Sequence, residues 1–390
     1  MKKIIFCLQT MVRGGVEKEL LTLLKCFDYS QYEVTLLLLY RSDENIISEI
    51  PSEVKFICLN INKTYYCSGI GTLVKSRLKS GKIFESASLV MKRMLNLESS
   101  HTAISLDEVN APDEEYDVAI CYHVHSPIMI KYVATKIEAK RKIGWMHNDF
   151  IASGFRIKSA IKYLNIYDEL VAVSNQVKNE FMQVCPEYLG KLSVAHNIVD
   201  VEEIVALSLQ IPEDSYFTDN HIKVLSVGRF TEQKGFDIAI EVAKVLRDKG
   251  VDFRWYLIGY GDNEIQYRNL IRKYKLTDIF VILGEKKNPY PYIANCDIYV
   301  QPSRHEAWGL VVHEARVLHK PILVSKFAGS DEQIVNGKTG YIVSISEIDK
   351  FIERLEKLIL DQGERERLEN NLRKEGYSKE DLHIIMSKFS

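Results

Sequence analysis

The 390-residue sequence has almost no net charge: 51 lysines and arginines stand against 53 aspartates and glutamates, for a formal net charge of −2. Charged residues make up 27% of the chain and hydrophobic residues 46%. This balance excludes a disordered chain or one that coats nucleic acid, and it is typical of a globular protein. We therefore expect no nucleic-acid partner.

The sequence also lacks long apolar runs and paired cysteines. No stretch reaches the roughly 18 apolar residues of a membrane span, and even residues 34–40 have only the length of a strand. The apolar run after Lys3 ends before Gln9, which is too short for a secretory signal. The seven cysteines show no CxxC spacing, so we expect free thiols in a reducing cytoplasm and no structural metal.

Short apolar runs alternate with longer segments, several of helical period, such as residues 17–27 and 236–249. Runs that are buried on both faces and separated by helices are typical of a parallel sheet. The sequence therefore predicts an α/β protein of two doubly wound halves. The runs are residues 3–8, 34–40, 54–59, 116–122, 142–146 and 169–173, then 222–227, 253–258, 279–283, 297–300 and 321–324.

The length favours two domains, and a polar stretch suggests where they divide. We predict a first domain over residues 1–200, a linker over 201–220 and a second domain over 221–377. Residues 378–390 begin with a likeness to a capping box and are expected to form a terminal helix that docks on another part of the protein. Ligands of open α/β sheets bind beyond the carboxyl ends of the strands, so we expect the chemistry in a cleft between two facing domains.

The segment from His305 to Ala315 carries the strongest indication of function. Gly309 leads an apolar turn that should open a helix, and such a turn offers unpaired backbone N–H groups and a positive dipole end to an anion. A rise of about 1.5 Å per residue separates Glu306 from Glu314 by roughly 12 Å. This spacing suits a nucleotide sugar whose pyrophosphate lies between the two carboxylates. The alternative is a pair of exposed helix glutamates.

Two other loops contain residues that suit a phosphate. Gly14 and Gly15 precede a helix after the first strand, and glycine lets the backbone approach a phosphate or sugar closely. Arg229 and Lys234 follow the first strand of the second half, where the two cations can share the charge of a diphosphate. The alternatives are a plain turn for the glycines and surface charge for the cations.

His147 and Asn148 follow another strand, which would direct them toward the cleft. A structural histidine is the alternative. The sequence Gly259-Tyr260-Gly261 also follows a strand, but the third glycine of a dinucleotide fingerprint is replaced by Glu264. We interpret it as a tight turn that lines the cleft.

Residues 63–93 depart from the alternation of strands and helices. A basic amphipathic segment of this kind can lie on an anionic membrane surface. A solvated helical excursion over the first domain is the alternative. Its basic residues, set against the single acid Glu85, are Lys63, Lys75, Arg77, Lys79, Lys82, Lys92 and Arg93.

The order and spacing of these motifs resemble the retaining glycosyltransferases of group 1, which have the GT-B fold of two facing Rossmann-like domains with a cleft between them. The resemblance covers nearly the whole chain, and it implies that the helix at residues 378–390 crosses back onto the first domain. The sequence departs from the usual family pattern at Ala307 and Trp308, so a slightly altered sugar pocket is expected. The motifs are Gly14-Gly15, Trp145-x-His147, Gly228-Arg229 with Lys234-Gly235, and Glu306-x7-Glu314.

The resemblance implies roles for individual residues. Glu306, His147, Arg229 and Lys234 are the implied catalytic set, in which the two cations hold the diphosphate while Glu306 and His147 contact the donor sugar. Glu314 is implied to hold the ribose hydroxyls. The implied donor-binding residues are Gly15, Gly228, Arg229, Lys234, Gly284, Glu285, Glu306, Gly309, Leu310, Val311 and Glu314, and the acceptor-side residues are Gly14, Gly15 and Asn148.

The resemblance further implies transfer of a hexose or N-acetylhexosamine from a nucleotide sugar. A UDP-sugar is the default donor, and a GDP-sugar is the alternative. The acceptor would be a glycan or a polyprenyl-linked molecule in bacterial cell-surface polysaccharide synthesis, on the inner face of the membrane. We expect no cofactor beyond the co-substrate and no metal, because cations and amides meet the developing charge. Front-face transfer is favoured and double displacement stays open.

Three other functions are compatible with some of these features. A UDP-sugar 2-epimerase would share the fold and the donor site but would need no acceptor. A non-enzymatic protein that binds sugar nucleotides or glycans would release no nucleoside diphosphate. A glycan phosphorylase would need a pyridoxal cofactor and a much longer chain, which makes it the weakest alternative.

Overall fold

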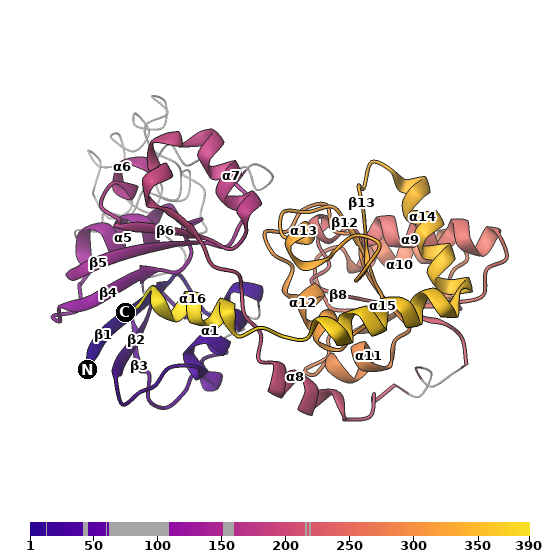
Figure 1. The fold of residues 1–390 in the computed structure, drawn as a ribbon, viewed down its shortest axis with the longest axis horizontal. Helices are drawn as coiled ribbons and strands as arrows, with labels where there is room; N and C mark the ends of the chain where they lie inside the picture. The colour runs from indigo at the N-terminus through magenta and orange to yellow at the C-terminus, as the bar shows by residue number, and fades with distance from the viewer. Residues whose placement is uncertain are drawn as a thin grey trace, which may run out of the picture. The chain divides into compact units, whose positions relative to one another are not determined.

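The computed structural model describes residues 1–12, 14–41, 46–59, 61, 109–150, 160–214, 217 and 220–390 (Figure 1). The basic segment 63–93 lies outside the described residues. The chain divides into two compact units. Unit 1 comprises Met1–Val173, Val177–His196 and His383–Ser390, and unit 2 comprises Ser174–Gln176 and Asn197–Leu382.

Within the described residues of unit 1, seven parallel strands form one sheet in the order β3-β2-β1-β4-β5-β6-β7. The strands are β1 (Lys2–Leu8), β2 (Tyr32–Leu38), β3 (Lys55–Cys58), β4 (Tyr116–Cys121), β5 (Ala139–Met146), β6 (Glu169–Ala172) and β7 (Leu192–Val194). The helices between them include α1 (Gly15–Lys25), η1 (Ile47–Glu49), α5 (Pro127–Lys136), α6 (Ile161–Leu164), α7 (Asn175–Val184) and η4 (Pro186–Lys191).

The described part of unit 2 contains six parallel strands in the order β10-β9-β8-β11-β12-β13. The strands are β8 (Lys223–Val227), β9 (Arg254–Ile258), β10 (Phe280–Gly284), β11 (Ile298–Gln301), β12 (Ile322–Ser325) and β13 (Tyr341–Val343). The helices are α8 (Val201–Ser208), η6 (Glu232–Lys234), α9 (Phe236–Asp248), α10 (Glu264–Lys273), α11 (Tyr290–Asn295), α12 (Leu310–Val317), α13 (Ser330–Gln333), α14 (Ile348–Leu360), α15 (Gln362–Glu375) and α16 (Glu380–Ser387), whose last residues lie in unit 1.

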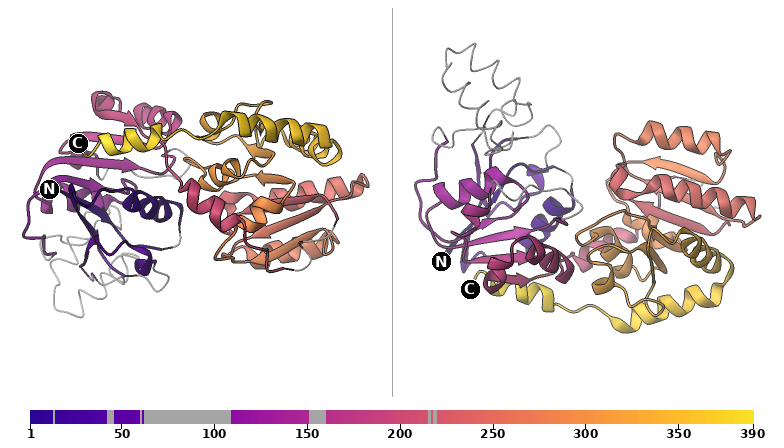
Figure 2. Two further views of the ribbon diagram at one scale, coloured as in Figure 1. Left: turned by 60° about the horizontal axis from the view of Figure 1, so that its bottom comes forward. Right: turned by 90° about the horizontal axis from the view of Figure 1, so that it is seen from above.

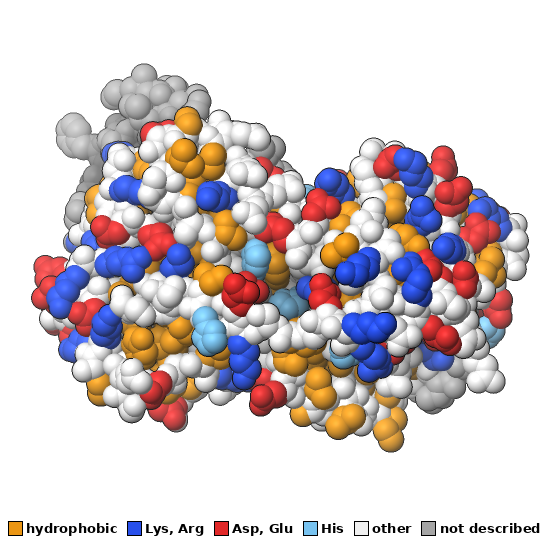
Figure 3. Space-filling view, viewed as in Figure 1, with side chains coloured by type: hydrophobic (Ala, Val, Ile, Leu, Met, Phe, Trp, Pro, Cys, Tyr) orange, Lys and Arg blue, Asp and Glu red, His pale blue; other side chains and the backbone are white. Residues whose placement is uncertain are grey.

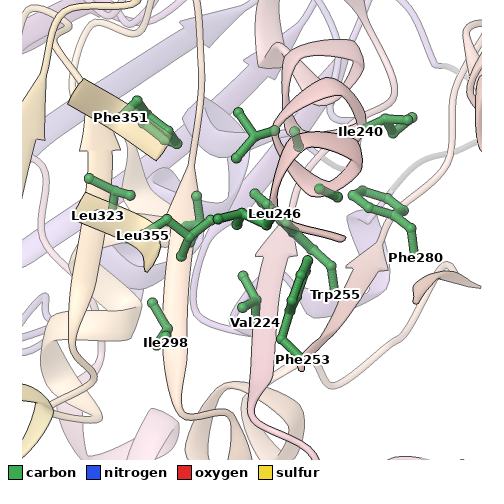
Figure 4. Close-up of a cluster of buried hydrophobic side chains, with 14 of the residues drawn as sticks. Val224, Ile240, Leu246, Phe253, Trp255, Phe280, Ile298, Leu323, Phe351 and Leu355 are labelled. Atoms are coloured by element: carbon green, nitrogen blue, oxygen red, sulfur yellow. The ribbon is translucent and has the colours of Figure 1, made fainter. Parts of the chain in front are cut away.

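Helices cover both faces of the sheet in unit 2 (Figure 2). On one face, Leu246 of α9 and Leu355 of α14 pack against Trp255 and other strand residues (Figure 4). On the other face, Ile204 of α8 and Val312 of α12 belong to a second apolar cluster. Strands buried in this way carry continuous apolar runs, which is the pattern that predicted the parallel sheets. The predicted α/β class is therefore confirmed.

Residues 201–220, which the sequence suggested as a linker, contain α8 and lie in unit 2. The boundary between the units falls earlier, between His196 and Asn197. The physical reason is that α8 packs on α11 and α12 and buries Ile204 in the core of unit 2. In the sequence, the polar residues that follow α8 made the whole stretch resemble a linker, so the amphipathic helix was not recognised.

The carboxyl-terminal segment packs in unit 1. The Phe389 side chain is fully buried, with its ring centroid 5.3 Å from that of Phe27 and 5.6 Å from that of Phe6. Lys388 Nζ forms an ion pair of 2.6 Å with Glu169. Apolar burial and one sheltered ion pair thus anchor this end of the chain.

The surface shows interspersed charges of both signs on the face that Figure 3 presents. This agrees with the formal net charge of −2. None of the helices in the described part of the chain has the length and apolar character to cross a bilayer.

Each sheet has one position where the strand order reverses: between β1 and β4 in unit 1, and between β8 and β11 in unit 2. Loops that leave such neighbouring strands run to opposite faces of the sheet and leave a crevice at the carboxyl ends of the strands. The crevices of the two sheets are therefore the first places to look for a ligand site.

Candidate functional site

The switch point of unit 2 brings together two residues that the sequence singled out. Lys234 ends η6, in the loop after β8, and Glu306 lies in the loop after β11. Lys234 Nζ and Glu306 Oε1 form an ion pair, and the two side chains are only 17% and 10% exposed. Their 72-residue separation in sequence is closed because β8 and β11 are adjacent strands.

A chain of buried hydrogen bonds fixes the Glu306 carboxylate. Ser303 Oγ donates to Glu306 Oε1 at 2.8 Å, and Gln301 Nε2 donates to Ser303 Oγ at 2.9 Å. Tyr299 OH in turn donates to Gln301 Oε1 at 3.1 Å. Because each buried polar group has a partner, the network holds the carboxylate in one position. No motif in the sequence marks these three supporting residues.

The loop after β8 is tied closely to the loop after β11. Arg304 forms hydrogen bonds of 2.8 and 2.6 Å with the Asp237 carboxylate and one of 2.7 Å with the backbone oxygen of Glu232. Burial raises the pKa of Asp237, but the hydrogen bonds and charge of Arg304 outweigh it, so that pKa is lowered. The bidentate pair ties the start of α9 to the second loop, and the bond to Glu232 ties η6, which ends at Lys234, to the same loop.

Gly235 is required where these loops meet. It adopts a left-handed conformation with φ of 66°, and a Cβ atom at this position would lie 2.0 Å from the backbone oxygen of Pro302. No side chain fits there. Gly235 thus permits the close approach that places Lys234 beside Glu306.

Helix α12 begins at the same switch point. Its N-cap residue Gly309 has φ of 84° and provides no side-chain cap. In the described part of the chain, no group accepts a hydrogen bond from the backbone N–H of Leu310 or Val311. The first turn of α12 therefore has the donors and the dipole end that favour an anion.

Glu314 lies one turn further along α12 and is 1% exposed. Tyr290 OH, at the start of α11, lies 3.4 Å from Glu314 Oε1 and donates toward it. Arg229 follows Gly228 directly after β8, and its side chain is exposed. The structure thus places Arg229, Lys234, Glu306 and Glu314 on the loops and helix of one switch point.

Gly284 and Glu285, which the family resemblance implies in donor binding, begin a segment whose later polar side chains bind elsewhere in unit 2. Lys286 pairs with Asp214 at 2.8 Å, and the Asn288 amide donates to the backbone oxygen of Leu207 at 3.0 Å. Both side chains are therefore engaged with the region around and after α8. Gly284 ends β10, and its carbonyl accepts a hydrogen bond of 2.9 Å from Gly259 N–H. The neighbouring Glu285 is exposed at this edge of the sheet.

The remaining predicted residues lie in unit 1. Gly14 is the N-cap of α1 with an extended φ of −138°, and Gly15 is its first residue. His147 follows β5 and is 6% exposed. Neither ring nitrogen of His147 has a hydrogen-bond partner within the described ranges. Because buried polar atoms usually have a partner, this favours a ligand over a purely structural role for His147.

Asn148 has a partner that no motif in the sequence indicates. Its Nδ2 lies 2.8 Å from Nε2 of His123, which follows β4. Burial, and then the neighbouring His125, lower the pKa of His123 to about 4. A single histidine has no spacing signature, so only the adjacency of β4 and β5 identifies this pair.

Comparison with known proteins identifies relatives. Residues 210–375 match the family model of glycosyl transferases group 1. The capsular polysaccharide biosynthesis glycosyltransferase CapM of Staphylococcus aureus is 25% identical over 225 residues, which cover 56% of this chain and 59% of CapM. The amylovoran biosynthesis glycosyltransferase AmsK of Erwinia amylovora is 31% identical over 151 residues, 37% of each chain. The chain thus matches only part of the length of these relatives.

Solved structures share the fold over the whole chain. A mutant of S. aureus TarM in complex with fondaparinux, α-GlcNAc-glycerol and UDP has a TM-score of 0.71 at 14% identity, covering 100% of both chains. Anabaena HepE in complex with UDP and glucose has a TM-score of 0.68 at 17% identity, covering 96% of this chain and 94% of HepE. The predicted GT-B fold class is confirmed, and the resemblance to glycosyltransferases of group 1 is confirmed over residues 210–375.

Proposed function

We propose, from the membership of residues 210–375 in glycosyl transferases group 1, that this chain transfers a hexose or N-acetylhexosamine from a nucleotide sugar to a hydroxyl of a glycan or polyprenyl-linked acceptor. The observation that carries this proposal is the Lys234 and Glu306 ion pair at the switch point where α12 begins. A cation, the first-turn amides of α12 and a carboxylate held by hydrogen bonds on the loops of one switch point support a diphosphate site there.

The difficult step is departure of a nucleoside diphosphate from the anomeric carbon. Negative charge develops on the leaving phosphate, and preorganised donors lower the free energy of that transition state. Arg229, Lys234 and the first-turn amides of α12 supply these donors. Because these groups already stabilise the negative charge on the leaving phosphate, this mechanism does not require a metal ion.

Glu306 is assigned to orienting the donor sugar. Its carboxylate is paired with Lys234 and accepts a hydrogen bond from Ser303. A carboxylate neutralised in this way is a poor nucleophile, which favours retention by front-face transfer. In that step the bond from the anomeric carbon to the phosphate oxygen breaks with its electron pair. The acceptor oxygen bonds to the same face, and its proton passes to the departing phosphate.

Glu314 is assigned to the ribose and His147 to the donor sugar. Glu314 is buried and accepts from Tyr290 at one oxygen, and a carboxylate is a good acceptor for vicinal hydroxyls. His147 is neutral near pH 7, because burial and then His123 lower its pKa well below the usual value. It can therefore donate to or accept from a sugar hydroxyl without adding charge.

The base and the pathway are proposed from the relatives. TarM and HepE were solved with UDP, which supports UDP as the carrier for this chain. CapM and AmsK are named for capsular polysaccharide and amylovoran biosynthesis, which supports cell-surface polysaccharide synthesis. The lipid-linked form of the acceptor is supported only by the basic character of residues 63–93.

Calorimetry tests the proposal. The wild-type chain is expected to bind UDP more tightly than GDP or ADP, and Lys234→Ala is expected to weaken UDP binding by more than about tenfold. Lys244→Ala is the matched control, because Lys244 is an exposed lysine of unit 2 that pairs with Asp248 across one turn of α9. Binding of none of the nucleotides, or equal effects of the two variants, would refute the donor site. Formation of an isomer from UDP-sugar alone would instead indicate an epimerase.

A further inference from the structure

The carboxyl edge of the sheet in unit 1 contains a polar pair with no role in the donor site. His123 and Asn148 follow the adjacent strands β4 and β5, with Asn148 Nδ2 at 2.8 Å from His123 Nε2. Val124 N–H donates to the backbone oxygen of Trp145 at 2.9 Å, which continues the ladder past His123. His123 is therefore held in a fixed position beside the switch point between β1 and β4.

The contact with Asn148 determines which ring nitrogen of His123 carries the proton. An amide nitrogen can only donate, so Nε2 of His123 accepts, and the proton of the neutral ring is on Nδ1. The lowered pKa of about 4 keeps the ring neutral near pH 7. His123 thus offers an N–H donor that carries no positive charge.

Two groups in this part of unit 1, the His147 ring and the Tyr122 hydroxyl, carry no hydrogen bond within the described residues. The His147 ring centroid lies 4.6 Å from that of Tyr122, which directly follows β4. Both nitrogens of His147 and the hydroxyl of Tyr122 are buried without a hydrogen-bond partner among the described residues. Within the described ranges, no group of three or more histidines, cysteines, aspartates or glutamates is arranged to hold a metal ion. Buried donors and acceptors without charge are complementary to hydroxyl groups.

We propose that His123, positioned by Asn148, binds a hydroxyl of the acceptor, and that the part of the acceptor bound here is an uncharged sugar and not a phosphate. This inference rests on the proposed function and deepens it by assigning the acceptor chemistry. Nδ1–H of His123 donates to the hydroxyl oxygen. Arginine and lysine stabilise an anionic group by their positive charge, and the neutral imidazole of His123 supplies no such charge.

NMR of the full chain with 15N-labelled histidine tests the tautomer and the ligand class together. The protein is saturated with UDP near neutral pH, and the His123 signals are assigned by their loss in His123→Gln. Methyl β-glucoside and methyl N-acetyl-β-glucosaminide serve as neutral probes, and glycerol 3-phosphate serves as the anionic probe. The expected result is a proton on Nδ1 and a shift of the His123 signals with at least one neutral glycoside but not with the phosphate.

Three results would overturn the inference: a proton on Nε2, a response to the phosphate alone, or no response to either glycoside. His123→Ala is expected to weaken glycoside affinity about tenfold, which is the loss of one well-placed hydrogen bond. Asn148→Leu keeps the ring but removes its donor, and it is expected to give mixed tautomers and a smaller loss, about threefold. His383→Ala, at an exposed position of α16, is the control and should change neither value.

UDP calorimetry on the same samples separates this inference from the proposed function. Absence of UDP binding in the wild-type chain counts against the donor site in unit 2. Normal UDP binding together with glycoside affinity that His123→Ala leaves unchanged counts against the acceptor role of His123 alone.

Discussion

At the residue scale, one largely buried ion pair fixes the positions of two charged groups in the proposed donor site. Lys234 and Glu306 are mostly buried, so their coupling is stronger than that of the exposed pairs on the surface. Ser303 holds the carboxylate from the other side. The pair therefore gives both partners a defined geometry and leaves Arg229 as the more exposed cation at this crevice.

Replacing Glu306 by glutamine tests the assignment of this carboxylate to the sugar. Glu306→Gln keeps the shape and one hydrogen-bonding oxygen but removes the charge that orients the sugar and Lys234. We expect release of UDP from a UDP-sugar to slow by on the order of 100-fold, with UDP affinity changed less than about threefold. Steady-state kinetics and calorimetry measure the two effects. Glu353→Gln, on the exposed face of α14, is the control, and a near wild-type rate for Glu306→Gln would remove Glu306 from the mechanism.

Sequence could identify only those site residues whose neighbours form a motif. Glu306 and Glu314 are placed by a turn and one helix, and Lys234 is placed by a glycine after a strand. His123 and Asn148 lie 25 residues apart on different strands. Their contact depends on strand order, which a single sequence does not give, so Asn148 was predicted but its partner His123 was not.

At the scale of elements, the loop between β8 and α9 depends on Gly235. A side chain there must adopt a φ of 66° and would clash with Pro302. We expect Gly235→Ala to destabilise unit 2 by more than about 2 kcal/mol and to weaken UDP binding, since it displaces Lys234.

Gly250→Ala is the matched control for this substitution. Gly250 has a similar φ of 79°, but a Cβ atom added there would meet nothing within 4 Å. Only the backbone strain remains, and a cost of about 1 kcal/mol without loss of UDP affinity is expected. Thermal unfolding and calorimetry compare the two variants. Equal destabilisation by both would show that the contact with Pro302 is not the cause.

The junction of β13, α14 and α15 is expected to make stability depend on acid pH. Hydrogen bonding from Arg367 lowers the pKa of Glu364 to about 2, against burial, which raises it, while Tyr341 and Lys357 add to the lowering. A depressed pKa contributes stability that is present above the unfolded value of about 4.3 and is lost as pH falls toward 2.

Glu364→Gln tests this junction. It should cost about 1–2 kcal/mol at pH 7 and progressively less as pH falls from about 4 to about 2. Urea unfolding at several pH values measures the difference. Glu369→Gln removes an exposed pair with Arg373 on the same helix and should cost less than about 0.5 kcal/mol. A cost for Glu364→Gln that is independent of pH would contradict the ion-pair explanation.

Among the elements of the fold, the β-strands were the easiest to predict from the sequence. The apolar run at residues 169–173 corresponds to β6 at Glu169–Ala172, and the run at 222–227 corresponds to β8 at Lys223–Val227. Parallel strands are apolar on both faces, so each run is continuous and easily recognised. Helix α8 was missed because only one side of it is buried and acidic residues surround it.

At the scale of the whole molecule, the near-zero net charge directs attention to local charge. The donor site needs only a few cations at one switch point, so it does not change the net charge of the whole chain noticeably. Residues 63–93 are the exception, with seven basic residues against one acidic residue. A charge imbalance of this size in one segment favours attraction to an anionic surface.

Vesicle flotation tests that attraction. The full chain is expected to float with vesicles that contain anionic lipid at low salt and to be released at high salt, because screening weakens the attraction. The triple variant Lys75→Glu, Arg77→Glu and Lys79→Glu is expected to remain unbound. The matched control reverses Lys244, Lys249 and Lys350, exposed lysines of unit 2. If the chain fails to float at low salt, or if both triple variants lose binding equally, then segment 63–93 does not bind the membrane and the polyprenyl-linked acceptor loses its support.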